Sequence, residues 1–277
     1  MFNPNNVLSA LVGLLEKNHL IHISGDPGSG KSIMAQTIAM GYIERNNKQV
    51  LYIDTMKKFS KKRFLTFFKE STKRDLFTMS EIQSLQAQEY LITKLKKMSE
   101  LKQLQEIGMI VFDSISHHLR HELTNGPFSH YMNTINGFHA CQIEPLIRIA
   151  VKNEIKLIFV HEMSYKPELG SIPFLLAYFE HIKGVWLPIK KIPIENGEYN
   201  NELDDDKKEE EDFDEISEDH YRRNKIRKEG KGSFYQYDSE FECFRAVLQI
   251  PAYNSGVPGE VLKVPFKIGN SGLKFCL

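Results

Sequence analysis

The residue types with the clearest chemistry in this sequence form a glycine-rich octapeptide near its beginning. It consists of Gly25, Asp26, Pro27, Gly28, Ser29, Gly30, Lys31 and Ser32, and it matches the phosphate-binding P-loop pattern G-x-x-x-x-G-K-[ST]. The glycines let backbone N–H groups approach phosphate oxygens, because no Cβ stands in the way. Lys31 would contact the β- and γ-phosphates, and the Ser32 hydroxyl would be a ligand of Mg²⁺. The octapeptide predicts a site for a nucleoside triphosphate with Mg²⁺.

The flanking segments have the order that a P-loop requires. Residues 20–24 are apolar enough for a buried strand, and residues 32–45 have the apolar spacing of a helix. The positive N-terminus of that helix would point at the phosphates. A chance glycine turn would not be expected to sit between these two elements.

A carboxylate further along the chain completes the predicted metal site. Asp113 ends the apolar run 109–113, which is the Walker B pattern. Its carboxylate would hold a water molecule on the Mg²⁺ that Ser32 binds. An Asp after an apolar strand is common, so the prediction depends on its coupling to the P-loop upstream.

The remaining pattern predicts an α/β fold in one core that covers residues 1–277. Apolar strands alternate with helices at 49–54, 80–105, 109–113, 142–153 and 157–160. This alternation is typical of a mainly parallel sheet flanked by helices on both faces. Strand-like segments with few helical signals between them follow at 185–189, 244–250 and 264–268. We therefore expect antiparallel strands at the C-terminal edge of the sheet.

Charge is balanced overall but unevenly distributed. The chain has 36 basic and 36 acidic residues, and 12 of the acids lie within residues 202–219. Without that segment, which also contains two lysines, the rest has 34 basic and 24 acidic residues. The predicted folded part is thus basic, which allows a polyanionic partner. Residues 191–240 read as a charged, disordered insertion, either a plain flexible loop or an arm that competes for that partner.

Composition also limits the cellular setting. Three scattered cysteines without a C-x-x-C pair argue against a disulfide framework and a zinc site. No basic segment precedes an apolar run at the beginning, and no apolar run is long enough to span a membrane. We expect a cytoplasmic protein, or a nuclear one in a eukaryote, with no membrane partner.

The order of these motifs resembles the RecA/RadA recombinase family, and RadB-like paralogues in particular. The P-loop is followed by Tyr52-Ile53-Asp54-Thr55 and then by Phe112-Asp113-Ser114-Ile115, and these segments carry the resemblance. The resemblance extends over most of the chain and implies a RecA-type P-loop core that binds ATP and Mg²⁺. It also implies that Arg63 stacks on adenine, although a plain surface arginine is an equal alternative. Residues 117–123 occupy the position of the family's first DNA-binding loop.

Two departures from the family affect the implied chemistry. The family's catalytic glutamate falls on Met56, which cannot accept a proton from water. The polar γ-phosphate sensor falls on Glu162, so Glu162 is a candidate for the missing base, beside Lys31 as the other catalytic residue. The family's second DNA-binding loop is glycine-rich, whereas residues 167–183 are apolar and predict a packed helix.

Two weaker clusters remain open. His117 and His121 have the i, i+4 spacing of a metal pair, but solvent-facing histidines are the better interpretation. Four lysines near the predicted nucleotide could form a solvated face or contact nucleic acid, namely Lys57, Lys58, Lys61 and Lys62.

The sequence therefore supports more than one function. The first is an ATP-binding recombinase paralogue in homologous recombination or DNA repair, with weak, DNA-dependent ATP hydrolysis. Single- or double-stranded DNA and another RecA/RadA-family protein are its expected partners. The alternatives are a nucleotide-gated, non-catalytic scaffold for another recombinase and a KaiC-like regulatory ATPase.

Overall fold

A computed structural model of the chain describes residues 4–69, 71–125, 128–167, 170–191, 244–251, 261–269 and 272–275. These parts all belong to one compact unit. Apart from residue 191, the predicted insertion 191–240 lies outside the described residues.

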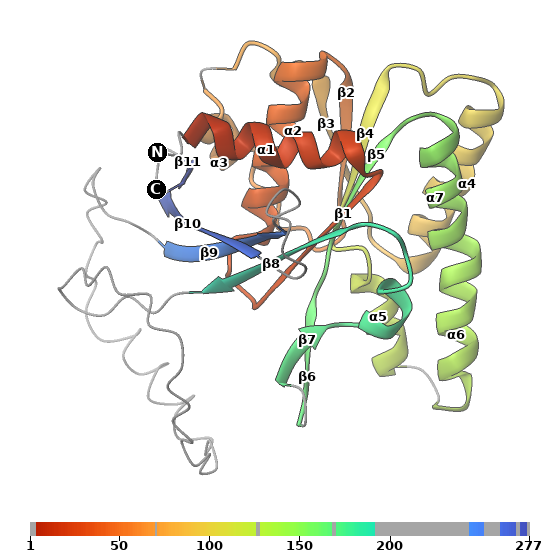
Figure 1. Cartoon of the computed structure of the whole chain (residues 1–277). Helices are drawn as coiled ribbons and strands as arrows, with labels where there is room; N and C mark the ends of the chain where they lie inside the picture. The colour runs from red at the N-terminus through yellow and green to blue at the C-terminus, as the bar shows by residue number, and fades with distance from the viewer. Residues whose placement is uncertain are drawn as a thin grey trace, which may run out of the picture. The chain divides into compact units, whose positions relative to one another are not determined.

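The first half of the fold alternates strands and helices (Figure 1). Its elements are α1 Pro4–Lys17, β1 Leu20–Gly25, α2 Lys31–Asn46, β2 Gln49–Asp54, α3 Lys61–Phe67, β3 Phe77–Glu81, α4 Leu85–Glu100, β4 Ile107–Asp113 and α5 His117–Asn125. A short 3₁₀ turn at Arg74–Leu76 precedes β3. Each of β1, β2 and β4 ends close to a predicted site residue, because the P-loop, Met56 and Asp113 lie at their carboxyl ends.

The second half completes the sheet. Its elements are a 3₁₀ turn Phe128–His130, α6 Tyr131–Phe138, a π turn His139–Ile143, α7 Glu144–Lys152, β5 Lys156–Val160, β6 Met163–Lys166, β7 Gly170–Pro173, α8 Leu176–Phe179, β8 Val185–Lys191, β9 Phe244–Pro251, β10 Val261–Gly269 and β11 Gly272–Phe275. Among the described helices, none is long and apolar enough to cross a bilayer.

Nine strands form the main sheet, in the order β11-β10-β9-β8-β1-β5-β4-β2-β3. The six strands from β8 to β3 are parallel, and β9, β10 and β11 pair antiparallel at the C-terminal edge. This arrangement confirms the predicted fold class. Strand β5 lies between β1 and β4, so the P-loop and Asp113 face each other across the end of one intervening strand.

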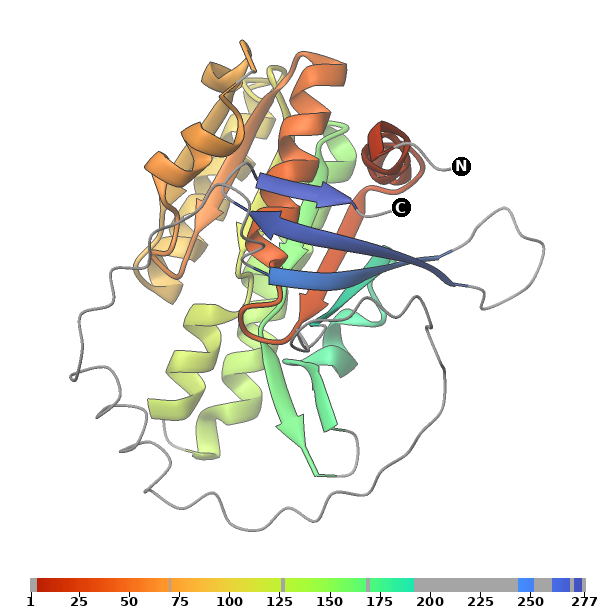
Figure 2. The same cartoon turned by 90° about the vertical axis from the view of Figure 1, so that its left-hand side faces the viewer.

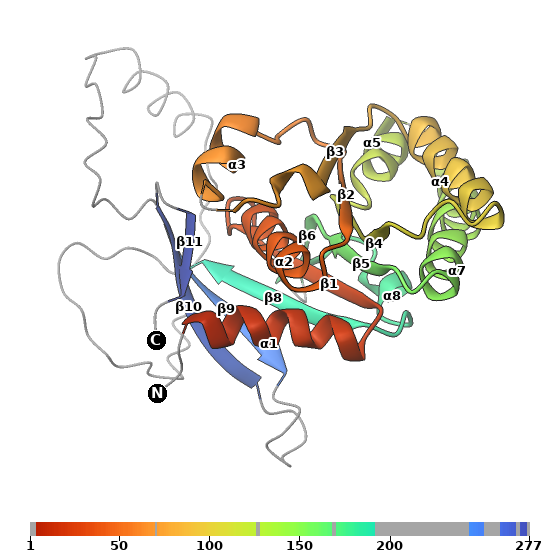
Figure 3. The same ribbon diagram turned by 90° about the horizontal axis from the view of Figure 1, so that it is seen from above.

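Helices cover both faces of the parallel strands (Figure 3). Ile21 and Ile23 of β1 pack on α1 and α2 in one core, whereas Leu20 belongs to a second core with α4 and α7. This alternation along a strand that is buried throughout explains why the parallel strands read as continuous apolar runs. Figure 2 shows β9, β10 and β11 passing in front of α2, and Phe266 of β10 joins the first core.

Two predicted helix boundaries were wrong. Residues 80–105 were expected as one helix with Ser80 as its N-cap, but Phe77–Glu81 is strand β3, paired in parallel with β2. The helix begins later, where the Ser84 hydroxyl accepts a hydrogen bond from the Ala87 N–H at 3.1 Å. It ends at Glu100, and Lys102 follows with a left-handed φ of 56°, which stops the helix.

The apolar segment 167–183 is also organised differently from the prediction. Part of it is strand β7, which forms a two-stranded antiparallel hairpin with β6, and among the residues described in this segment only Leu176–Phe179 is helical. Phe179 is buried in the second core, so the expected packing role holds for this residue. The prediction of a single packed helix was wrong, because Gly170 begins a strand that pairs with Lys166.

Candidate nucleotide-binding site

The P-loop connects the end of β1 to the start of α2 through three glycines with positive φ. Gly28 and Gly30 have φ values of 75° and 90°, in the left-handed region that favours glycine. At Gly25 a Cβ would lie 2.3 Å from the Ile189 carbonyl oxygen of β8. The Ser29 N–H donates to the Asp26 carbonyl at 3.0 Å and closes the turn. The glycines are thus required by geometry as well as by the motif.

Lys31, the first residue of α2, lies among carbonyls and carboxylates. Its Nζ donates to the backbone oxygens of Gly25 and Asp26 at 2.5 and 2.9 Å. Burial lowers the pKa of Lys31, while the nearby Asp113, Asp26 and Glu162 carboxylates raise it. The ammonium is therefore held under the loop by neutral carbonyl oxygens, and the charged phosphate oxygens of a nucleotide could replace them.

Asp113 is buried at the end of β4 and lies near two hydroxyls. Tyr52 of β2 donates from its Oη to Asp113 Oδ2 at 2.5 Å, and Ser32 lines the same cavity. Burial raises the pKa of Asp113, while the Ser32 and Tyr52 hydroxyls lower it. The structure thus brings together Ser32 and Asp113, the two residues predicted to hold Mg²⁺.

The donor set fits a magnesium ion. A hydroxyl and a carboxylate are oxygen ligands, and Mg²⁺ commonly takes only one or two of them from protein and the rest from phosphates and water. Among the described residues there is no cluster of three His, Cys, Asp or Glu side chains that could hold a metal by itself. A divalent cation beside Asp113 would also favour the ionised carboxylate that burial opposes.

These residues open into one cavity of about 680 Å³ at the carboxyl edge of the sheet. Its volume is in the range of small-molecule sites in proteins. Predicted site residues that line it are Pro27, Gly28, Ser29, Gly30, Lys31, Ser32, Arg63, Asp113 and Glu162. Gly25 and Asp26 form the base of the loop instead. The buried Ser29 hydroxyl has no hydrogen-bond partner, so the cradle contains a donor for an incoming anion.

Arg63 and Met56 reach the cavity from the segment that follows β2. The Arg63 guanidinium lies 4.9 Å from the centre of the Phe67 ring and also lines the cavity. Met56 lines it as well, but the adjacent Asp54 is engaged elsewhere, because its carboxylate accepts the N–H groups of Met56 and Phe59 at 3.0 and 2.7 Å. The Asp54 carboxylate at the end of β2 thus holds the backbone of the loop that follows it, between Met56 and Phe59.

Glu162 follows β5 and is held from α5. Its Oε1 is 3.0 Å from His117 Nδ1, and its Oε2 is 3.9 Å from Arg120 Nη1. The sequence offered His117 as part of a metal pair with His121, as a solvent-facing histidine or as part of a DNA-binding loop, but not as a partner of Glu162. His121 contacts Asn125. The signal that could have found the pair is topological, because the residues after β4 and β5 meet at one edge of adjacent parallel strands.

Sequence reasoning also missed a histidine pair beside the site. His22 Nδ1 of β1 lies 2.9 Å from His161 Nε2, and the His22 ring stacks on Trp186 with centroids 4.3 Å apart. Burial lowers the pKa of His22 to about 3 and lowers that of His161 well below its ordinary value. Both imidazoles are neutral at pH 7, and His161 lines the cavity next to Glu162.

The lysines near the site have separate roles. Lys58 lines the cavity, and Lys57 pairs with Glu81 at 3.6 Å. Lys61 and Lys62 are exposed in the first turn of α3. The four therefore do not form one free basic face.

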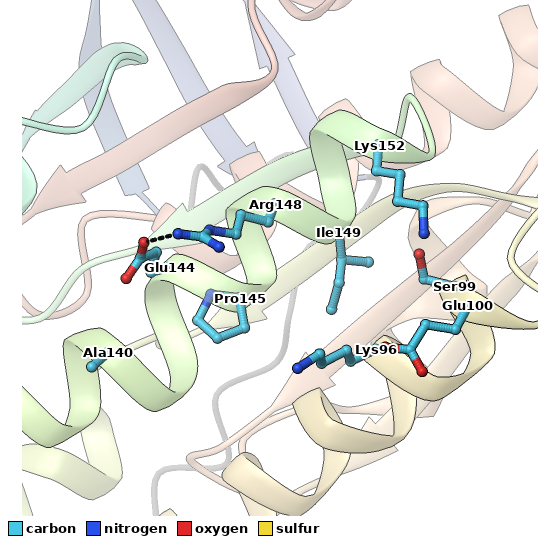
Figure 4. Close-up of a pocket in the computed structure, with 9 residues that line it drawn as sticks. All are labelled: Lys96, Ser99, Glu100, Ala140, Glu144, Pro145, Arg148, Ile149 and Lys152. Carbon is cyan, nitrogen blue, oxygen red and sulfur yellow. Dashed lines mark hydrogen bonds and ion pairs between the residues drawn. The ribbon is translucent and has the colours of Figure 1, made fainter.

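A second, smaller hollow of about 270 Å³ lies between α4 and α7 (Figure 4). Lys96 and Glu100 line it from α4, and Arg148 pairs with Glu144 at 2.5 Å on α7. No glycine-rich loop lines this hollow. Its lining contains both basic and acidic side chains, and Arg148 and Glu144 of α7 already pair with each other. Of these two cavities, only the first has the chemistry of a triphosphate site.

Comparisons with known proteins agree on a P-loop fold. A family model described as "Novel STAND NTPase 3" matches residues 2–77, which contain the P-loop, α2 and β2. No curated protein sequence matches the chain. The structure is similar to the crystal structure of the RadB recombinase, with a TM-score of 0.55, 17% identity, and coverage of 92% of this chain and 89% of that chain. The chain has the RecA-type P-loop α/β fold.

Proposed function

We propose that the chain binds ATP with Mg²⁺ in the cavity beneath the P-loop and hydrolyses it slowly. The observation that carries this proposal is the convergence of Lys31, Ser32 and Asp113 on one cavity. Bound Mg²⁺ would supply charge neutralisation between the β- and γ-phosphates. Arg63, held over Phe67 at the rim of the same cavity, supports adenine as the base.

Slow hydrolysis follows from the residue at the end of β2. Met56 lines the cavity where the resemblance places a catalytic glutamate, and Asp54 is occupied by two backbone N–H groups. Glu162 is then the carboxylate left to accept a proton from the attacking water, and Lys31 would stabilise the charge on the transferred phosphoryl group.

For the biological role we propose a recombinase paralogue that acts in homologous recombination or DNA repair. The similarity to the RadB recombinase along nearly the whole chain supports this role, as does the basic balance outside residues 202–219. DNA and another RecA/RadA-family protein are the partners that this role implies.

A nucleotide-gated scaffold or regulatory NTPase is the second candidate. It is favoured by Met56 and by the β6–β7 hairpin, which stands where the resemblance places a mobile, glycine-rich DNA-binding loop. The match of residues 2–77 to a STAND NTPase model also favours a regulatory NTPase.

Turnover measurements on the full chain separate the two candidates. We expect Mg²⁺-dependent ATP binding and a turnover number below about 1 s⁻¹, at the low end of enzyme rates. Stimulation by single-stranded DNA would support the recombinase role, whereas binding without turnover, unchanged by DNA, would support the scaffold. Absence of nucleotide binding would overturn both.

A further inference from the structure

Glu162 is held in place both through its backbone and through its side chain. Its backbone carbonyl accepts the Phe174 N–H at 2.8 Å, which ties it to the segment after β7. The next carbonyl, of Met163, accepts a hydrogen bond from Arg120 Nη1 at 2.7 Å. The same guanidinium lies 5.4 Å from the centre of the Phe174 ring. The Glu162 carbonyl and the one that follows it are therefore held by the segment after β7 and by α5, respectively.

The Glu162 side chain is also oriented from α5. His117, the first residue of that helix, lies with Nδ1 at 3.0 Å from Oε1, so a proton on Nδ1 is donated to the carboxylate. His117 does not line the nucleotide cavity, whereas Glu162 does. The histidine thus holds Oε1 from outside the cavity and leaves the other carboxylate oxygen, Oε2, without a hydrogen bond.

That other oxygen is the group a hydrolytic site needs. Glu162 Oε2 is buried and has no hydrogen-bond partner, and Arg120 Nη1 lies 3.9 Å from it. The carboxylate is near enough to Lys31 to raise the pKa of that ammonium. An unsatisfied buried acceptor beside the phosphate-binding lysine is suited to accept a hydrogen bond from a water molecule.

We propose that His117 and Arg120 are positioning residues that hold Glu162 as the water-activating group of this site. The proposal rests on the proposed ATP hydrolysis. A water oxygen would form a bond to the γ-phosphorus while the bond from that phosphorus to the bridging oxygen breaks. ADP leaves with the bonding electron pair, orthophosphate forms, and the water proton passes to Glu162 Oε2 and later to solvent. The base is thereby moved from the end of β2, where Met56 stands, to the end of β5.

The test compares three histidine variants of the full chain with Mg·ATP. His117→Ala removes the donor and should lower kcat at least 10-fold while KM stays within about two-fold, because the base is misplaced but the cradle is intact. His117→Asn can still donate an N–H to Oε1 and should recover kcat to within about three-fold of the parent. His121→Ala, one turn further along α5 and exposed, is the matched control and should leave kcat unchanged.

Two further measurements keep the outcomes distinct. Glu162→Gln retains size and position, and it should lower kcat at least as much as His117→Ala. Normal Mg·ATP affinity with unchanged kcat in His117→Ala or Glu162→Gln would overturn the positioning role, and so would failure of His117→Asn to recover activity. If the parent chain does not bind Mg·ATP, the proposed function fails instead. Should His117→Ala not fold, Glu162→Gln and Arg120→Lys decide the question, because unchanged kcat in both contradicts it.

Discussion

The Tyr52 hydroxyl donates to Asp113 Oδ2 at 2.5 Å, and this bond joins the ends of two neighbouring parallel strands inside the candidate site. The Tyr52 ring packs against Phe59 and Phe77, so the hydroxyl is held in place by an apolar cluster. Since burial raises the pKa of Asp113 and the Tyr52 hydrogen bond lowers it, the tyrosine helps to keep an ionised carboxylate available for a metal.

Tyr52→Phe should retain the ring packing but leave Asp113 with one donor fewer. We expect the free energy of unfolding at pH 7 to fall by about 1–3 kcal/mol, as for other buried acceptors that lose a partner. Urea denaturation measures this change. Tyr90 is exposed on α4, so Tyr90→Phe is the control and should change stability by less than about 0.5 kcal/mol. Equal effects of the two substitutions would contradict the role of the Tyr52 hydroxyl.

Gly25→Ala should be far more damaging than a glycine change elsewhere. A Cβ at residue 25 would lie 2.3 Å from the backbone oxygen of Ile189. The alanine would also have to adopt the backbone φ of 148° that Gly25 has, which side-chain-bearing residues rarely adopt. We expect a loss of more than about 2 kcal/mol in stability and loss of nucleotide binding. Gly13 of α1 has open space around it, so Gly13→Ala should be neutral or stabilising by about 0.5–1 kcal/mol. A tolerated Gly25→Ala would show that β8 does not constrain the loop.

The buried histidine pair predicts loss of stability in acid. The pKa of His22 is lowered by burial to about 3 in the folded chain, against about 6.5 when unfolded. The unfolded state therefore binds more protons between these values, so this stability is complete above about pH 6.5 and is lost as the pH falls toward 3. His22→Gln should reduce the fall in unfolding free energy between pH 6.5 and 4.5 by more than about 1 kcal/mol.

The control for this pH effect is His121→Gln, because His121 is exposed on α5, where it contacts Asn125. Its unfolding free energy should follow that of the parent chain across the same pH range. If His22→Gln follows the parent as closely, the acid sensitivity comes from other groups.

Met56 offers a test of the missing base by reconstruction. In the Glu162→Gln background, Met56→Glu should raise ATP turnover at least 10-fold, because it returns a carboxylate to the end of β2 inside the cavity. Met56→Gln in the same background has the same length without a proton-accepting carboxylate and should not raise turnover. Equal turnover in the two double variants would show that position 56 cannot supply the base.

The parts of this site that could be predicted are those encoded within a few consecutive residues. The P-loop between a strand and a helix, and Asp113 at the end of an apolar strand, are local patterns, and the structure brings them into one cavity. Strand β3 was missed because it lies at the edge of the sheet and Ser80 resembles a helix N-cap. Its pairing with β2 is a tertiary effect that local propensity does not contain.

The contact between His117 and Glu162 could not be predicted from local pattern, because 45 residues separate the two in sequence. It depends on β4 and β5 being neighbours and on the exit direction of α5. The resemblance placed residues 117–123 in a DNA-binding loop, whereas His117, His118 and Arg120 each contact the protein itself, at Glu162, Ile82 and Met163 respectively.

The central claim is that Lys31 belongs to a cradle for the phosphates of ATP. Isothermal titration of the full chain with ATP in Mg²⁺ should give saturable binding, and Lys31→Ala should weaken it at least 100-fold, or about 2.7 kcal/mol. Lys102→Ala, at an exposed lysine just after α4, should bind like the parent chain. Unchanged affinity in Lys31→Ala would contradict the account.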